Sequence, residues 1–268
     1  TNVDPMVVDL DYGLGWFLLG MRKTSDSFDG LVFKGGTCLR KCYFPGYRFS
    51  EDLDFTATKF LSPANMEEWI TKIIAWISDQ DGPDFRVQPV RFDVVDDEYG
   101  NESYQARIYY RGPLRWGGSP RSVKLDITRA ETVILPVREK QIIHPYSDQA
   151  VFSFNVLPCY SLEEVIAEKI RAIRGQRRFA VSRDIYDIHN LVSAGIDSDA
   201  VRRILPEKFK ARGLSLLKLY ENKLEPRRIE FEIDWERRLN YLVLNRDLQF
   251  EEVWHSFFSF LDELWDNL

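Results

Sequence analysis

The sequence predicts an α+β protein whose first part combines strands with helices and whose last part is helical. Two patterns lead to this prediction. Short segments of alternating polar and apolar residues recur as far as residue 128, whereas beyond residue 160 the apolar residues recur at helical spacing. The 268 residues also suffice for two domains with cores of their own. We therefore predict one domain over residues 1–155 and a helical domain over residues 156–268.

Two helices of the first domain have recognisable beginnings. Asp4 precedes Pro5, and Ser62 precedes Pro63; each pair places a capping residue before a proline at the first helical position. The first helix is expected to end near Met21. The buried face of the second is predicted to consist of Met66, Ile70, Ile73 and Ile77. Strands are predicted at 31–33, 50–56, 85–95, 104–110 and 122–128, with a turn at Asn101, a short helix and loop at 38–47, and a loop at 111–120.

The second domain begins with a capping box. Ser161 is followed three residues later by Glu164, and the helix is predicted to end near Arg174. Ser182 is expected to cap another helix that ends before Gly195. Further helices are predicted at 199–204, 206–221 and 250–268.

Composition and charge exclude several classes of protein. A net charge of −6 argues against broad, non-specific nucleic-acid binding, although a local basic groove is compatible with it. No apolar stretch approaches the roughly 18 residues that a membrane span needs, and the acidic start does not resemble a signal peptide. Cys38, Cys42 and Cys159 do not have the spacing of a zinc site, so we expect buried thiols in a reducing cytoplasm.

Residues that can handle phosphates and metal ions follow the first strand. Glycines such as Gly35 and Gly36 let a backbone approach a ligand closely, and amides at a helix start can hold a phosphate. Asp52 and Asp54 lie two positions apart on a predicted strand and therefore point to the same face. Two adjacent carboxylates repel each other unless a cation lies between them, so this pair favours Mg²⁺ that also contacts a triphosphate.

A third carboxylate is predicted on a later strand. Asp126 alternates with the apolar residues Val123, Leu125 and Ile127, so it lies on the opposite face together with Lys124. If this strand neighbours the one with Asp52 and Asp54, Asp126 becomes a third metal ligand or the base that accepts the proton of an attacking hydroxyl.

The combination of a strand, the Gly35-Gly36-Thr37 turn, an Asp-x-Asp strand and a later strand aspartate resembles the DNA polymerase beta nucleotidyltransferase superfamily. That resemblance implies a mixed sheet with flanking helices. Additional motifs are Lys34 before the glycines, Arg48 and Ser50 before the acids, Glu164-x-x-x-Glu168-Lys169-Ile170 and Arg183-Asp184-Ile185-Tyr186-Asp187. Together these motifs are similar to those of the AbiEii/AbiGii toxin family of type IV toxin–antitoxin systems, over roughly residues 31–191.

The resemblance implies a role for each matching position. Lys34, Arg48 and Ser50 would lie at the incoming nucleoside triphosphate, and Gly35, Gly36 and Thr37 would hold its phosphates. Asp52 and Asp54 would bind Mg²⁺, or Mn²⁺ in its place, and Lys169 and Asp184 match two further essential positions. Related mycobacterial (MenT-like) members add nucleotides to the 3′ acceptor end of tRNA and block translation, so tRNA and a cognate antitoxin are the implied partners.

The later motif can also be examined from helical spacing alone. Lys169 falls between Ile166 and Ile173 on a predicted buried stripe, and Asp184 lies four residues before the inward-facing Ile188. A lysine in such a place needs an acidic or phosphate partner. Either Asp184 orients Lys169 toward the triphosphate, or the two form an ion pair that only ties two helices together.

Contact with RNA requires cationic side chains near the acids. The arginines that we predict for this role are Arg111, Arg115, Arg121, Arg174, Arg177 and Arg178. Phosphorylation of Ser50, on the expected face of Asp52, would repel the nucleotide. Two other classes remain open, a metal-dependent phosphodiesterase or nuclease that uses the same acids, and a non-catalytic nucleotide-binding partner protein.

Overall fold

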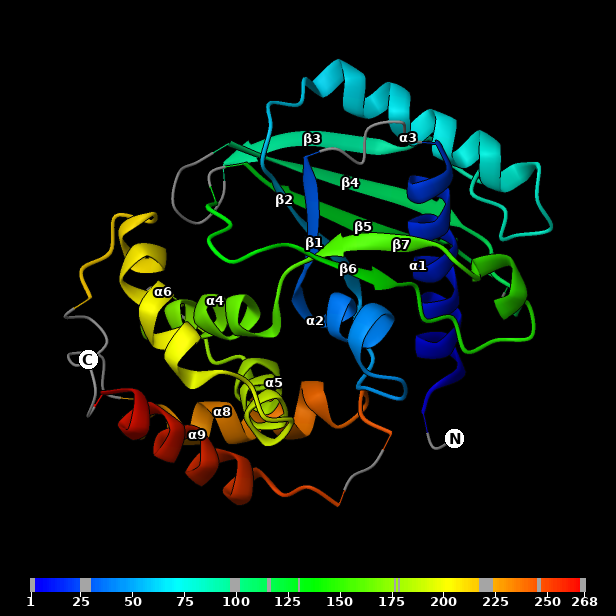
Figure 1. Cartoon of the computed structure of the whole chain (residues 1–268). Coiled ribbons are helices and arrows are strands. Elements are labelled where there is room, and N and C mark those ends of the chain that lie inside the picture. The colour runs from blue at the N-terminus through cyan, green and yellow to red at the C-terminus, as the bar shows by residue number, and fades with distance from the viewer. Residues whose placement is uncertain are drawn as a thin grey trace. The chain divides into compact units, whose positions relative to one another are not determined.

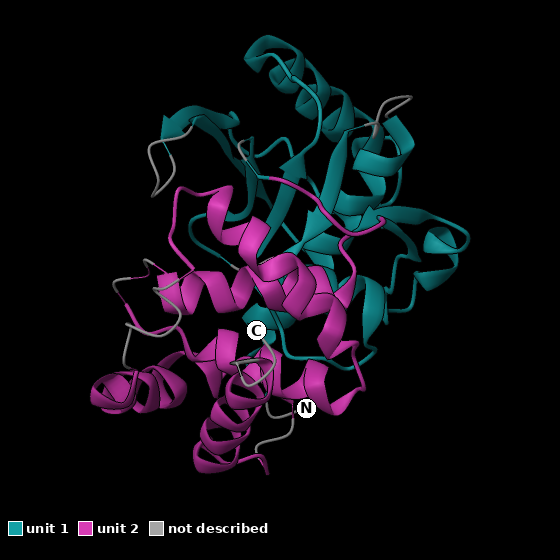
Figure 2. Cartoon of the chain, turned by 60° about the vertical axis from the view of Figure 1, so that its left-hand side comes forward, with its two compact units in different colours: residues 1–131, 137–159 teal, residues 132–136, 160–268 magenta. Residues whose placement is uncertain are grey.

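The computed structural model describes residues 3–24, 30–96, 102–114, 117–129, 131–175, 177, 179–216, 224–244 and 247–265 (Figure 1). The chain forms two compact units (Figure 2). Unit 1 contains residues 1–131 and 137–159, and unit 2 contains residues 132–136 and 160–268. Among the described residues, none of the helices combines the length and the apolar composition that crossing a lipid bilayer requires.

Unit 1 is built on a mixed sheet of seven strands in the order β3-β4-β5-β2-β1-β7-β6 (Figure 1). The strands are β1 (Leu31–Lys34), β2 (Asp52–Ala57), β3 (Arg91–Asp96), β4 (Glu102–Tyr110), β5 (Arg121–Thr128), β6 (Arg138–Gln141) and β7 (Val156–Cys159). Neighbouring strands are antiparallel except for two pairs, β2 with β5 and β1 with β7, which run parallel. The predicted mixed sheet is therefore confirmed.

Two helices of unit 1, α1 (Pro5–Thr24) and α3 (Pro63–Ser78), pack together and share the core with one face of the sheet. Both begin as predicted, because Asp4 accepts a hydrogen bond from the amide of Met6, and Ser62 accepts one from the amide of Asn65. Alternate residues of the strands point into this core. The opposite face of β2, β4 and β5 is therefore left for polar side chains.

A short helical segment follows β1 and leads back toward β2. It consists of α2 (Gly35–Cys38) and a single π-helical turn at Leu39–Tyr43. The sequence predicts a helix here, but its start lies three residues earlier than expected, at the first glycine.

Several boundaries in unit 1 differ from the predictions. The strand expected at 85–95 begins only at Arg91, because Pro89 has no amide hydrogen for the ladder and restricts the residue before it. The sequence also missed β6, a polar edge strand, and β7, which contains Pro158. Since β7 pairs with both β1 and β6, the boundary expected at residue 155 lies one strand too early. The turn predicted at Asn101 lies outside the described residues.

Unit 2 is helical, as predicted. Its helices are α4 (Leu162–Gly175), α5 (Ser182–Ser193), α6 (Ser198–Lys210), α8 (Arg228–Asp234) and α9 (Phe250–Trp265), with a 3-10 turn at Glu225–Arg227 and a π turn at Trp235–Leu239. The predicted break before Pro206 is wrong. A continuous apolar stripe, Val201, Ile204, Leu205 and Phe209, keeps α6 helical through the proline.

Two of the three helix caps predicted in unit 2 are confirmed, and one is wrong. Ser161 accepts a hydrogen bond from the amide of Glu164, as in a capping box. Ser182 does not act as the predicted cap, because it is the first residue of α5 and donates both its amide and its hydroxyl to Asp234. Gly195 follows α5 with a φ of +81°, as predicted for a residue that ends a helix.

Candidate active site

The polar face of the sheet carries its charged residues in two rows. The first row crosses five strands, because register pairs Lys34 on β1 with Asp54 on β2, Asp54 with Asp126 on β5, Asp126 with Gln105 on β4, and Gln105 with Asp93 on the edge strand β3. Residues paired in this way share one face of the sheet. Side chains from three separate stretches of sequence, around residues 34, 54 and 126, are thus brought side by side.

The second row lies two residues further along the same strands. It contains Asp52 on β2, Lys124 on β5 and Arg107 on β4, again as register partners. Members of both rows line a pocket of about 230 Å³, namely Asp52, Gln105, Ala106, Arg107, Lys124 and Asp126. The pocket is therefore lined by two carboxyl groups and two cations.

The Oδ1 atom of Asp52 forms an ion pair but accepts no hydrogen bond from the described residues. Lys124 Nζ lies 3.2 Å from Asp52 Oδ1 as an ion pair, but its direction is not that of a hydrogen bond. Within the described part of the chain, this buried oxygen has no hydrogen-bond donor. A buried carboxylate oxygen without a donor, close to a second carboxyl group, suits a hard divalent cation such as Mg²⁺. The residues present therefore fit the metal that the sequence predicts.

The pKa of Asp126 is raised by its surroundings, which include a second carboxyl group. Burial raises the pKa of its carboxyl group, and the negative charge of Asp52 raises it further, against the opposing effects of Lys124, Gln105 and Arg107. A cation between the carboxylates would relieve this repulsion. A carboxylate with a raised pKa is also a better proton acceptor than an ordinary aspartate.

The Gly35-Gly36-Thr37 turn lies close against Asp52 and Asp54. Gly35 has a φ of +75°, and a Cβ atom there would lie 2.6 Å from Asp54 Oδ2. A Cβ atom at Gly36 would lie 2.5 Å from Arg48 Nη2. The hydroxyl of Thr37 donates to the backbone carbonyl of Asp52 over 2.5 Å. The turn thus contacts both metal-binding candidates, through Gly35 and Thr37.

We expect Gly35→Ala to reduce activity by about 100-fold, because the new methyl group would displace Asp54 by a large fraction of an ångström. The left-handed backbone adds a strain of about 1–2 kcal/mol. Gly46→Ala is the matched control, since Gly46 has a φ of +77° with nothing within 4 Å of its Cβ position. Steady-state rates and melting temperatures of both variants would test this. Equal activity loss in the two variants would show that backbone strain, and not contact with Asp54, is responsible.

Three further residues predicted for the nucleotide differ in accessibility. Lys34 is partly exposed at the end of β1, opposite Asp54. Arg48 is buried, and its Nη1 donates to the carbonyl of Phe49 over 3.0 Å. Ser50 is also buried and precedes β2, so the strand alternation expected to align it with Asp52 does not extend to it.

In unit 2, Lys169 and Asp184 form the contact that helical spacing predicts. Lys169 Nζ lies 2.6 Å from Asp184 Oδ1 and 2.8 Å from Asp187 Oδ2, and Arg177 also pairs with Asp184. Burial raises the pKa of Asp184, but the positive charges of Lys169 and Arg177 outweigh it and hold the pKa below its usual range. Asp187 stands in the family motif quoted above but was assigned no role, and its side chain is fully buried beside Lys169.

Four of the six arginines predicted to contact RNA are described, Arg111 and Arg121 in unit 1 and Arg174 and Arg177 in unit 2. Arg115 and Arg178 lie outside the described residues. Arg121 pairs in register with Tyr110, which contacts α1, so it lies on the opposite face of the sheet from Asp126. Its predicted place beside the acids is therefore wrong. Arg107 and Lys124 are the cations that the register brings to them.

The remaining arginines have different surroundings. Arg111 is exposed where β4 ends, and its amide donates to the carbonyl of Asp84. Arg174 is buried in place of the expected exposed position, and burial lowers its pKa against the charges of Glu225 and Asp262. Arg177 is about one-third exposed and is committed in part to Asp184.

A mixed sheet that presents three aspartates beside a glycine turn defines a nucleotidyltransferase. The chain belongs to the family of nucleotidyl transferase AbiEii toxins of type IV toxin–antitoxin systems, whose family model matches residues 16–262. Among solved structures it is similar to MenT4, a nucleotidyltransferase toxin from Mycobacterium tuberculosis H37Rv. The two are 27% identical, with a TM-score of 0.62 over 96% of this chain and 84% of MenT4.

JHP933 from Helicobacter pylori shares the fold. It is 16% identical, with a TM-score of 0.60 over 100% of this chain and 95% of JHP933. No curated protein sequence matches this chain. The family match and the likeness to MenT4 confirm the resemblance inferred from the motifs.

We expect Asp126→Asn to stabilise the metal-free protein while lowering its activity by about 100-fold or more. Because the pKa of Asp126 is raised on folding, its favourable contribution is complete at acid pH and is lost as the pH rises through the raised value. The gain in melting temperature should therefore be larger at about pH 7 than at about pH 4. Thermal unfolding of both proteins across this range would measure it. The same gain at every pH would contradict the assigned cause.

Proposed function

We propose that this protein transfers a nucleoside monophosphate from a nucleoside triphosphate to the 3′ end of an RNA, with the tRNA acceptor end as substrate, and thereby blocks translation. The proposal is supported chiefly by the row of Lys34, Asp54 and Asp126 with Asp52 two residues away. Such a toxin would act in the cytoplasm, on the same tRNA pool that ribosomes use, and would require a cognate antitoxin.

In the proposed reaction, the 3′ oxygen of the RNA attacks the α-phosphorus, and the bond to the leaving pyrophosphate breaks. Asp52 and Asp54, with Asp126 as a third ligand or as the base, would hold Mg²⁺, which when bound would supply positive charge to stabilise the reacting phosphate. As the base, Asp126 would accept the proton of the 3′ hydroxyl. Lys34 and Lys124 would offset negative charge that accumulates on the phosphates.

The test is a transfer assay with each of the four labelled nucleoside triphosphates, total tRNA and Mg²⁺. We expect tRNA to be lengthened with at least one nucleotide, and the reaction to stop with a chelator or in Asp52→Asn. Mn²⁺ is expected to substitute for Mg²⁺. Absence of transfer with all four nucleotides would overturn the proposal, and shortened RNA would assign the acids to a nuclease instead.

The role of Lys169 can be tested in the same assay. We propose that Lys169, oriented by Asp184, contacts the triphosphate. Lys169→Met should then raise the KM for the nucleotide as well as lowering kcat. A variant that loses thermal stability but keeps its KM would show that the ion pair only ties α4 to α5. Growth inhibition that persists in Asp52→Ala would favour a non-catalytic binding protein.

The proposed regulation at Ser50 has a structural requirement. Ser50 is buried, so a kinase could reach it only after the segment before β2 moves. Ser50→Asp should reduce transfer, because the added charge lies two residues from Asp52. Full activity in this variant would discard the idea.

A further inference from the structure

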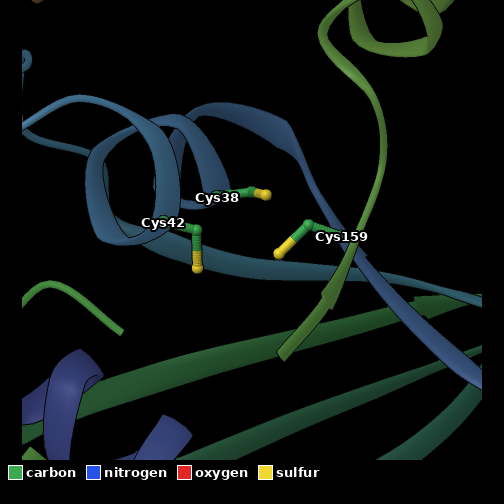
Figure 3. A group of neighbouring side chains, drawn as sticks. All are labelled: Cys38, Cys42 and Cys159. Carbon is green, nitrogen blue, oxygen red and sulfur yellow. The ribbon is translucent and has the colours of Figure 1, made fainter. Parts of the chain in front are cut away.

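Three cysteines that are far apart in the sequence meet in unit 1. Cys38 ends α2, Cys42 lies in the π turn that follows, and Cys159 ends β7, the strand beside β1. Their sulfur atoms all lie within 4.8 Å of one another, and Figure 3 shows them around a common space between the helical segment and the strand. The expectation of three buried thiols is confirmed, but their sequence spacing concealed that they form one cluster.

The surroundings of the cluster suit a bound cation. Cys38 and Cys159 are fully buried, and Cys42 retains only 6% exposure, so the thiols are shielded from solvent. The positive charges of Lys41 and Lys140 act on Cys42 and favour its thiolate form. The same two lysines would offset the net negative charge of a metal bound by three thiolates.

We propose that Cys38, Cys42 and Cys159 form a binding site for one thiophilic metal ion, Cu⁺ or Zn²⁺, distinct from the aspartate site. Thiolates select these soft ions, whereas Mg²⁺ prefers oxygen ligands. With metal–sulfur bonds of about 2.3 Å, sulfur atoms around one ion lie about 3.8 Å apart. The observed spacing therefore requires only a small inward movement of the side chains. Each coordinating thiol releases its proton to solvent on binding.

Such an ion would stabilise the turn at residues 35–37, which is predicted to bind the nucleotide. Cys38 closes the same short helix in which Gly35 contacts Asp54 and Thr37 donates to the carbonyl of Asp52. Coordination would join that helix to the next helical turn through Cys42 and to the sheet through Cys159. The metal-bound protein should therefore unfold at a higher temperature than the metal-free protein.

The test uses the full chain, reduced and freed of metal under anaerobic conditions. Zn²⁺ and Cu⁺ are titrated separately against a chromophoric chelator, and Co²⁺ serves as a spectroscopic probe for sulfur-to-metal charge transfer. We expect one ion per chain and thiolate bands with Co²⁺. Cys159→Ala should weaken binding by about 100-fold or more, since even outer-shell partners contribute about 10–100-fold.

Two variants make the outcome decisive. Asp54→Asn should bind the thiophilic ion as tightly as the natural protein, which separates this site from the proposed catalytic one. Circular dichroism and melting temperature of metal-free Cys159→Ala and Cys42→Ala would establish that they are folded. Absence of binding by the folded, fully reduced chain, or unchanged affinity in both folded variants, would overturn the proposal. So would a disulfide between two of these cysteines that persists under reducing conditions.

Discussion

Asp54→Asn is expected to lower the rate of nucleotidyl transfer by about 10³-fold or more, with little change in the fold. Asp54 lies at the centre of the first row, paired in register with Lys34 on one side and Asp126 on the other. Asparagine keeps the size and one carbonyl oxygen of the side chain but removes the negative charge that a divalent cation needs. The loss should therefore appear in activity and in metal affinity together.

A control on the same sheet separates this effect from a general loss of charge. Asp93 lies on the edge strand β3 at the end of the same row, separated from Asp126 by Gln105, and its half-exposed side chain forms an ion pair with Arg91. Asp93→Asn should keep its activity, and its stability should change by less than about 0.5 kcal/mol. Transfer rates and Mg²⁺-dependent shifts in melting temperature, measured for both variants, would decide. Retention of even one-tenth of the natural rate in Asp54→Asn would exclude Asp54 as an essential metal ligand.

Local pattern was enough to place each candidate acid on the correct face of its strand. The alternation of Asp126 with Val123, Leu125 and Ile127 fixes that face whatever strand lies beside it. The partner strand and the register are set by contacts far apart in the chain, and no local signal contains them. The sequence left the adjacency of β2 and β5 as a condition, and the structure shows that the two strands pair.

Sequence analysis misplaced Arg121 and missed the meeting of the cysteines for two different reasons. Arg121 and Lys124 are three positions apart, so they lie on opposite faces of β5, although both belong to one basic segment of the sequence. Cys159 is 117 residues from Cys42, and only the parallel pairing of β7 with β1 brings it near. The face of Arg121 follows from alternation once β5 is known to begin at this residue, whereas the place of Cys159 depends on which strand lies beside which.

The Glu164 and Glu168 positions of the family motif have a structural role that the sequence did not reveal. Both contact Lys208 on α6, a lysine with no exposed surface, at 2.5 and 3.3 Å. Glu164 also accepts hydrogen bonds from the amides of Ile134 and Leu135, and Lys208 donates to the carbonyl of Thr132. These hydrogen bonds join residues 132–136 to α4 and α6, and the segment accordingly belongs to unit 2.

Lys208→Met is accordingly expected to destabilise the protein by about 3–5 kcal/mol, because it leaves the buried carboxylate of Glu164 without its cation. Lys210→Met is the matched control, since Lys210 is exposed on the same helix and should change stability by less than about 0.5 kcal/mol. Urea unfolding of both variants would measure the difference.

A double variant tests whether the cost comes from the uncompensated charge. In Lys208→Met with Glu164→Gln, the buried charge is removed together with its partner, while the amide oxygen of glutamine can still accept from one backbone amide. The combined destabilisation should therefore be smaller than the sum of the two single changes. Strict additivity would mean that Lys208 stabilises unit 2 through its packing against Tyr160 and the segment at 132–136, and not through the charge of Glu164.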